Sequence, residues 1–202
     1  MSAAAADFFL AGLPVPDGAT PPEPGTPLHD YLARRQADSF GAVGEVALRF
    51  AAWSALRDDG PFGGRARTRS ELRGIRARLD RGEPAVLGLV TVSIAESVAL
   101  WSNHQVLAFA LEADDGREAI RVYDPNYPGR DDVRLAFRTT LEGVLTLPAW
   151  PAVPAPVLGA AAELHVGQRP ARPVRGVFEV PYRRSRPPAG LVTAAPASRA
   201  TH

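Results

Sequence analysis

Two apolar runs with an Asp-Gly pair between them constrain the fold of this chain most. Residues 106–111 and 120–123 each have the composition of a β-strand, and Asp-Gly occupies positions 115–116. Asp-Gly between two such runs predicts a hairpin, because glycine adopts positive φ without steric cost. Counting outward from the turn places His104 opposite residues 124–127. The hairpin therefore ends with an imidazole beside a carboxylate or carboxamide.

An imidazole oriented by an acid or amide on the next strand is the base half of a nucleophile–base–orienter site. His104 and Asp124 are accordingly candidate catalytic residues. The spacing also fits a plainer interpretation, in which His104 is an ordinary surface or core residue and Asp-Pro-Asn is a turn. Spacing alone leaves both interpretations open.

The run NHQVLAFALEADDGREAIRVYDPNYPG, residues 103–129, resembles the His-to-Asp half of the papain-like cysteine peptidase superfamily. It is most similar to the branch of leader-peptide-cleaving domains of bacteriocin exporters. The preceding segment RTRSELRGIRARLDRGEPAVLGLV, residues 67–90, also fits that pattern. The resemblance implies an α+β, papain-like fold, with N-terminal helices packed on a mostly antiparallel β-sheet. It also implies that His104 is the general base and Asp124 the orienting acid.

The same resemblance places four side chains around the groove of such a site. They are predicted to contact substrate, with Asn103 and Gln105 shaping the entrance beside His104, Trp101 on the wall before it, and Asn126 after Asp124.

The chain departs from the family in having no cysteine. The resemblance implies a nucleophilic cysteine at the start of a buried helix, in a Cys-Gly-Gly-Met-like sequence. Residues 2–11 predict such a buried, alanine-rich helix, and Met1 matches the methionine of that motif. We therefore expect the chain as given to start a few residues too late or to have lost the cysteine. Ser2, the nearest hydroxyl, lies beyond the expected position.

These observations predict a cysteine-peptidase-like domain that keeps the His and Asp of a catalytic triad and is inactive without its cysteine. Full-length relatives would hydrolyse peptide or amide bonds. One alternative is a non-catalytic module that binds a peptide in the same groove, and another is a purely structural domain. The expected partner is a peptide or protein, and the sequence specifies no oligomeric state.

The composition and charge of the chain restrict the other classes of protein to which it can belong. A chain of 202 residues with 46% apolar content suits one domain with a substantial core. The net charge of +1 gives no reason to expect nucleic acid binding, and no run of eighteen apolar residues predicts a membrane span. No secretory signal is evident, so a cytoplasmic location is the default. Scattered histidines and the lack of a dinucleotide fingerprint predict neither a metal nor a cofactor.

The predicted domain organisation has four parts: a papain-like peptidase-type domain over 1–148, a Pro/Ala-rich linker over 149–173, a final strand over 174–182 and a disordered tail over 183–202. Helices are predicted at 2–11, 27–40, 43–56 and 68–81, and strands outside the hairpin at 85–92, 133–138 and 144–147. All 23 basic residues are arginine, and several crowd the helix at 68–81. That helix either presents a solvated face or binds a partner.

Overall fold

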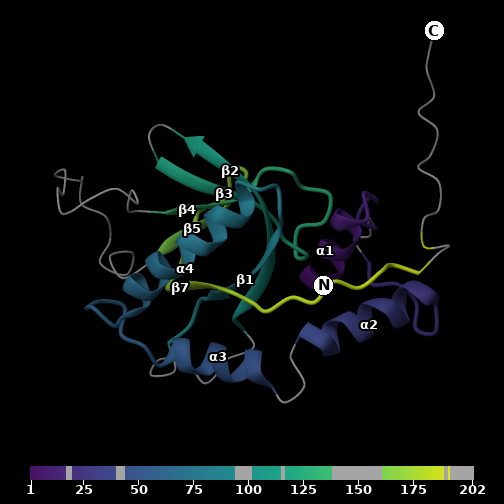
Figure 1. Ribbon diagram of the computed structural model, residues 1–202, viewed down its shortest axis with the longest axis horizontal. Coiled ribbons are helices and arrows are strands. Elements are labelled where there is room, and N and C mark those ends of the chain that lie inside the picture. Colours follow the sequence, from purple (N-terminus) through teal and green to yellow (C-terminus); the bar gives the residue numbers. More distant parts are fainter. Residues whose placement is uncertain are drawn as a thin grey trace, which may run out of the picture.

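The computed structural model describes residues 1–16, 20–39, 44–93, 102–114, 117–137 and 161–188, together with residue 191. Its helices are α1 (Ser2–Leu10), α2 (Pro27–Ser39), α3 (Glu45–Ser54) and α4 (Gly64–Leu79). Its strands are β1 (Ala85–Val90), β2 (His104–Asp114), β3 (Arg117–Tyr123), β4 (Val133–Phe137), β5 (Ala162–Val166), β6 (Arg172–Val174) and β7 (Gly176–Glu179). The helices precede the strands along the chain, which makes the fold α+β (Figure 1).

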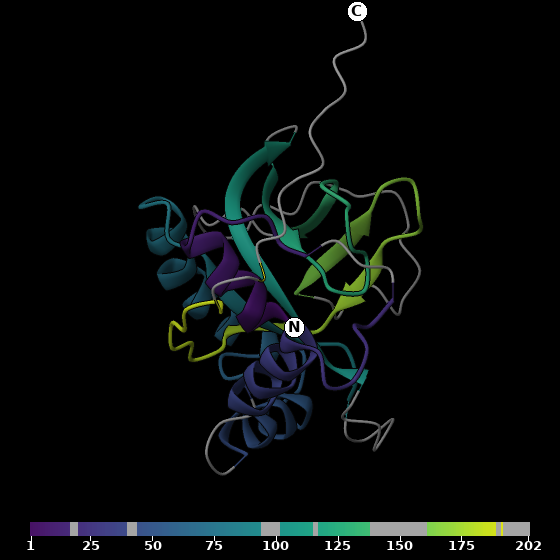
Figure 2. The same ribbon diagram turned by 90° about the vertical axis from the view of Figure 1, so that its right-hand side faces the viewer.

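The strands of the described residues form one antiparallel sheet in the order β6-β5-β4-β3-β2-β1-β7. β6 and β7 stand at opposite ends of this order, yet a single residue, Arg175, joins them in the chain. The two edges must therefore meet, and the sheet curls into a nearly closed barrel (Figure 2). The backbone N–H of Arg175 donates to the carbonyl of Val90 at 2.8 Å at this junction.

β1 is buried on both faces, as predicted, because its alternate side chains enter different cores. Leu87 and Leu89 join a core that also contains Ile75 of α4. Val86 and Val90 join a second core, formed with side chains of α1 and α3. Each such aliphatic side chain contributes about 1.5–3 kcal/mol when fully buried. The strand that pairs with the start of β2 is therefore firmly held.

α4 covers the outer edge of β7. Thr68 and Glu71 are predicted to form a capping box at a helix start, but α4 begins one turn earlier, at Gly64, so that prediction is wrong. Instead the Thr68 hydroxyl and the Glu71 carboxylate accept hydrogen bonds from the N–H groups of Val177 and Glu179, each at 3.0 Å. These amides point away from β1, on the side where an edge strand has no neighbouring strand to accept its hydrogen bonds. The side chains of α4 accept them instead. The predicted final strand is therefore present as β7, at one end of the strand order.

The other predicted helices are confirmed, with ends that differ by a few residues. α1, α2 and α3 match the predictions at 2–11, 27–40 and 43–56. α2 begins as its sequence indicates, because the Thr26 hydroxyl accepts a hydrogen bond from the N–H of His29 at 3.3 Å.

The linker prediction is wrong for the described residues 161–173, which contain β5 and most of β6. Ala162, Leu164 and Val166 are buried and alternate with less buried polar residues, which is a strand pattern. Proline and alanine on both sides conceal this short pattern in the composition. Residues 149–160 and the strand predicted at 144–147 lie outside the described residues.

The tail prediction is also wrong for residues 183–188, which run between α1 and α2 (Figure 1). Arg35 of α2 donates to the carbonyl of Arg183, and Arg184 donates to the carbonyl of Leu10, both at 2.8 Å. These bonds link positions about 150 residues or more apart, and no local pattern in the sequence indicates them. Residues 192–202 lie outside the described residues.

Candidate functional site

The turn after β3 holds the carboxylate of Asp124 in place. Pro125 has no N–H and cannot continue the strand ladder, so pairing of β3 ends at Tyr123. The N–H of Asn126 donates to Asp124 Oδ1 at 2.8 Å, and the N–H of Tyr127 donates to the Asp124 carbonyl at 2.9 Å. Aspartate commonly organises a turn through such bonds to the backbone two residues ahead. Hydrogen bonds within the turn therefore set the direction of this side chain.

The hairpin brings His104 to Asp124, as predicted. Leu107 pairs with Tyr123, and continuing that register places His104 opposite Asn126. Asp124 is then the diagonal neighbour on the same face of the sheet. His104 Nε2 lies 2.6 Å from Asp124 Oδ1. Of the two side chains, Asp124 is 1% exposed and His104 is 23% exposed.

The contact with Asp124 assigns the ring nitrogens different roles. A carboxylate only accepts hydrogen bonds, so the Nε2–H of His104 donates to it. In the neutral imidazole Nδ1 then lacks a proton and can accept one. The side-chain amide of Asn126 also lies 3.4 Å from Nε2, a long contact. Since Nε2 donates to Asp124, it cannot also accept from this amide, and the shorter contact sets the tautomer.

The amino end of α1 contacts the backbone at the start of β2. The Ser2 hydroxyl donates to the carbonyl of Gln105 at 2.8 Å, directly after His104 in β2. Seven of the nine residues of α1 are buried, from Ser2 to Phe8. A helix amino end carries partial positive charge, which stabilises an anion placed there. This helix end contacts the strand that carries His104. The side chain of His104 shares its face of the sheet with Leu89 and Val106, whereas α1 packs on the opposite face, against Val86 and Leu107.

The predicted substrate-contacting residues have different positions. Asn126 lies at the pair itself, as described above. Gln105 contacts α1 through its carbonyl. The side-chain amide of Asn103 is engaged with Thr91 and Ser54. Trp101 lies outside the described residues.

Asp124 is the least completely bonded of the buried acids. Its Oδ1 accepts from two donors, whereas its Oδ2 is buried without a hydrogen-bond partner among the described residues. A buried carboxylate oxygen that lacks a donor costs free energy. The arrangement at Asp124, with both donors on Oδ1, therefore has some cost in stability.

A second buried carboxylate, Asp7 of α1, was not singled out from the sequence. It accepts from the hydroxyls of Tyr31 and Tyr182, from Nε of Arg35 and from the N–H of Ser185. Burial, followed by the hydrogen bond to Asp7, raises the pKa of both tyrosines above the ordinary value. The available signal was a lone acid in an otherwise apolar helix, because a buried charge needs partners.

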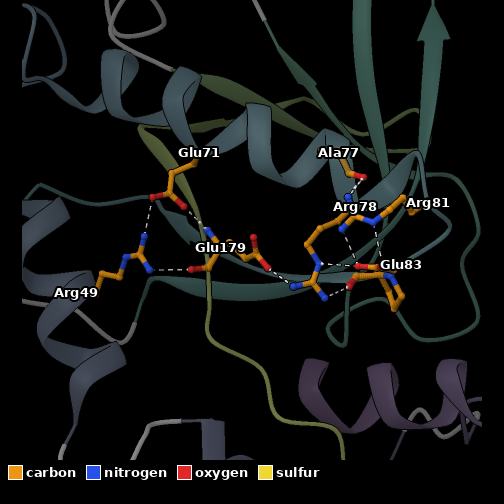
Figure 3. A network of polar contacts seen from close by, with 8 residues as sticks. Arg49, Glu71, Ala77, Arg78, Arg81, Glu83 and Glu179 are labelled. Atoms are coloured by element: carbon orange, nitrogen blue, oxygen red, sulfur yellow. Dashed lines mark hydrogen bonds and ion pairs between the residues drawn. The ribbon is translucent and has the colours of Figure 1, made fainter.

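The arginine-rich helix α4 uses several of its charges within the molecule. Glu71 binds Arg49 of α3 at 2.7 Å, and Arg78 binds Glu179 of β7 at 2.8 Å (Figure 3). Arg81 pairs with Glu83 immediately after the helix, at 2.9 Å. These contacts fasten α4 to α3 and β7. At least this part of the basic face has a structural role.

Among the described residues, no three His, Asp or Glu side chains gather closely enough to hold a metal ion. The described helices include none long and apolar enough to cross a membrane. Comparison of the chain with protein-family models, with curated proteins and with solved structures finds no match.

Proposed function

We propose that this chain is a cysteine-peptidase-like domain of the papain-like type, in which His104 is the general base and Asp124 orients it. The observation that carries the proposal is the 2.6 Å contact between His104 Nε2 and Asp124 Oδ1, on a strand whose backbone contacts the amino end of a buried helix. Such chemistry needs a thiolate, an imidazole that holds it as an ion pair, and a group that orients the imidazole. His104 and Asp124 are the candidates for the last two.

The thiol is the missing component, since the chain contains no cysteine. Ser2 is a poor substitute, because its hydroxyl already donates to the Gln105 carbonyl. As given, the chain is expected to hydrolyse nothing. A residue four positions before Ser2 would lie one helical turn away on the same face of an extended α1, close to the start of β2.

The test places Cys-Gly-Gly directly before Met1 and measures alkylation by a fluorescent iodoacetamide at pH 6. At this pH an ordinary thiol is almost entirely protonated and reacts slowly. We expect the added cysteine to react at least about tenfold faster than in the same chain carrying His104→Ala, because the imidazole stabilises the thiolate. The unextended chain, with no thiol, supplies the blank.

Equal alkylation rates with and without His104 would contradict the proposal. A module that binds a peptide without cleaving it and a purely structural domain would then remain as the alternatives.

A further inference from the structure

The residue before His104 is held from two directions. Asn103 Oδ1 accepts from the N–H of Thr91, which follows β1, at 3.0 Å. Asn103 Nδ2 donates to the hydroxyl of Ser54, the last residue of α3, at 3.2 Å. Thr91 also donates through its hydroxyl to the carbonyl of Ser102 at 2.8 Å. The backbone that enters β2 is therefore fixed to both a strand and a helix.

Ser54 has no exposed surface and lies on the inner face of α3 with Phe50 and Trp53. A buried hydroxyl needs a hydrogen-bond partner, and serine is not a strong helix former. An alanine would suit this position better if packing were its only role. The hydrogen bond to Asn103 explains why a serine occupies this position.

Arg175 fixes Ser54 in turn. Its guanidinium donates to the carbonyls of Ser54, Leu56 and Val92 at 3.3, 3.0 and 3.0 Å. The carbonyls at the end of a helix lack partners within the helix, and a basic side chain commonly satisfies them. Arg175 is also the residue that joins β6 to β7. The closure of the barrel is thus connected, through Ser54 and Asn103, to the start of β2.

We propose that Asn103 and Ser54 are positioning residues that hold His104 in the orientation in which Nε2 donates to Asp124. Small displacements matter at such a site, because proton transfer requires the ring within hydrogen-bond distance of its partners. The role of His104 as a base rests on the proposed function. The positioning itself rests only on the contacts of Asn103, and it gives this side chain a task other than the predicted contact with substrate.

The test reads the tautomer of His104 in two-bond proton–nitrogen correlation spectra of the unextended chain. The chain has four histidines, so the spectra are simple, and a His104→Gln variant assigns the signal. We expect the neutral ring to be the Nε2–H form alone. In Asn103→Leu and in Ser54→Ala a measurable fraction of the Nδ1–H form should appear. Asn103→Asp should keep the single form, since its carboxylate can accept from Thr91 and from the Ser54 hydroxyl.

Ser70→Ala on the exposed face of α4 is the matched serine control, and urea unfolding of each variant measures any general loss of stability. A single Nε2–H form in both Asn103→Leu and Ser54→Ala would overturn the proposal, whatever their stability. Equal tautomer mixing in Ser70→Ala would do the same. If Asn103→Leu fails to fold, Ser54→Ala decides alone. Failure of the thiol experiment leaves this result intact, because no thiol takes part in it.

Discussion

Asp7 and Asp124 are both carboxylates buried almost completely, and their surroundings differ sharply. Asp7 accepts hydrogen bonds on both oxygens, from two tyrosines, an arginine and a backbone amide. Asp124 accepts on one oxygen only, and its neighbour His104 remains partly exposed. The acid that joins α1 to α2 and to residues 182–185 is saturated with donors, whereas the acid that contacts a partly exposed imidazole keeps one oxygen without a donor.

The largest expected loss of stability follows the substitution of Asp7, which accepts hydrogen bonds on both oxygens. Asp7→Asn leaves the guanidinium of Arg35 without its buried partner and should lower the free energy of unfolding by about 3–5 kcal/mol. Urea denaturation followed by circular dichroism measures this. Asp38→Asn, which removes the half-exposed partner of the same arginine, should cost less than about 1 kcal/mol. Similar losses in both variants would show that burial is not what makes Asp7 important.

A smaller loss of stability is expected when Asp124, which accepts hydrogen bonds on one oxygen only, is replaced. In Asp124→Asn the amide oxygen can still accept from His104 and from the N–H of Asn126, so unfolding free energy should fall by less than about 1.5 kcal/mol. In the chain extended with Cys-Gly-Gly, the same substitution should slow alkylation, because an imidazolium without a neighbouring carboxylate is less stable. The contrast between the two acids disappears if Asp124→Asn destabilises the protein as much as Asp7→Asn.

The smallest expected effect is a change in how the stability of the protein depends on pH. The pKa of Tyr182 is raised in the folded protein, so its contribution is complete below the ordinary tyrosine pKa of about 10 and is lost as pH rises toward the raised value. Tyr182→Phe should cost about 1 kcal/mol at pH 7 and make stability fall less steeply between about pH 9 and 11. Tyr127→Phe, whose ring lies beside Arg169, is the control. An unchanged pH profile in Tyr182→Phe would remove this tyrosine from the Asp7 cluster.

The sequence by itself determined the hairpin and the first three helices, and it brought His104 to within a few residues of Asp124. Each depends on signals within a few residues: an Asp-Gly pair between two apolar runs, apolar periodicity, and an Asp-Pro-Asn turn that aims a carboxylate. The turn predicts only that His104 lies opposite residues 124–127. The register next to the turn, in which Leu111 pairs with Ile120, would place His104 opposite Tyr127, with its side chain on the other face of the sheet from Asp124. A register shift between Ala108 and Ala110 moves His104 opposite Asn126 and so brings it to the face of Asp124.

Only the tertiary structure decided how the barrel closes and what braces the site. Thr68 and Glu71 match a local capping pattern, but the unpaired amides of β7 bind them instead. The partners of Asp7 include Tyr182, 175 residues away in the chain, and the partner of Ser54 is Asn103. Contacts of this kind form where buried polar groups from distant segments must satisfy one another, and that requirement leaves no periodic trace in the sequence.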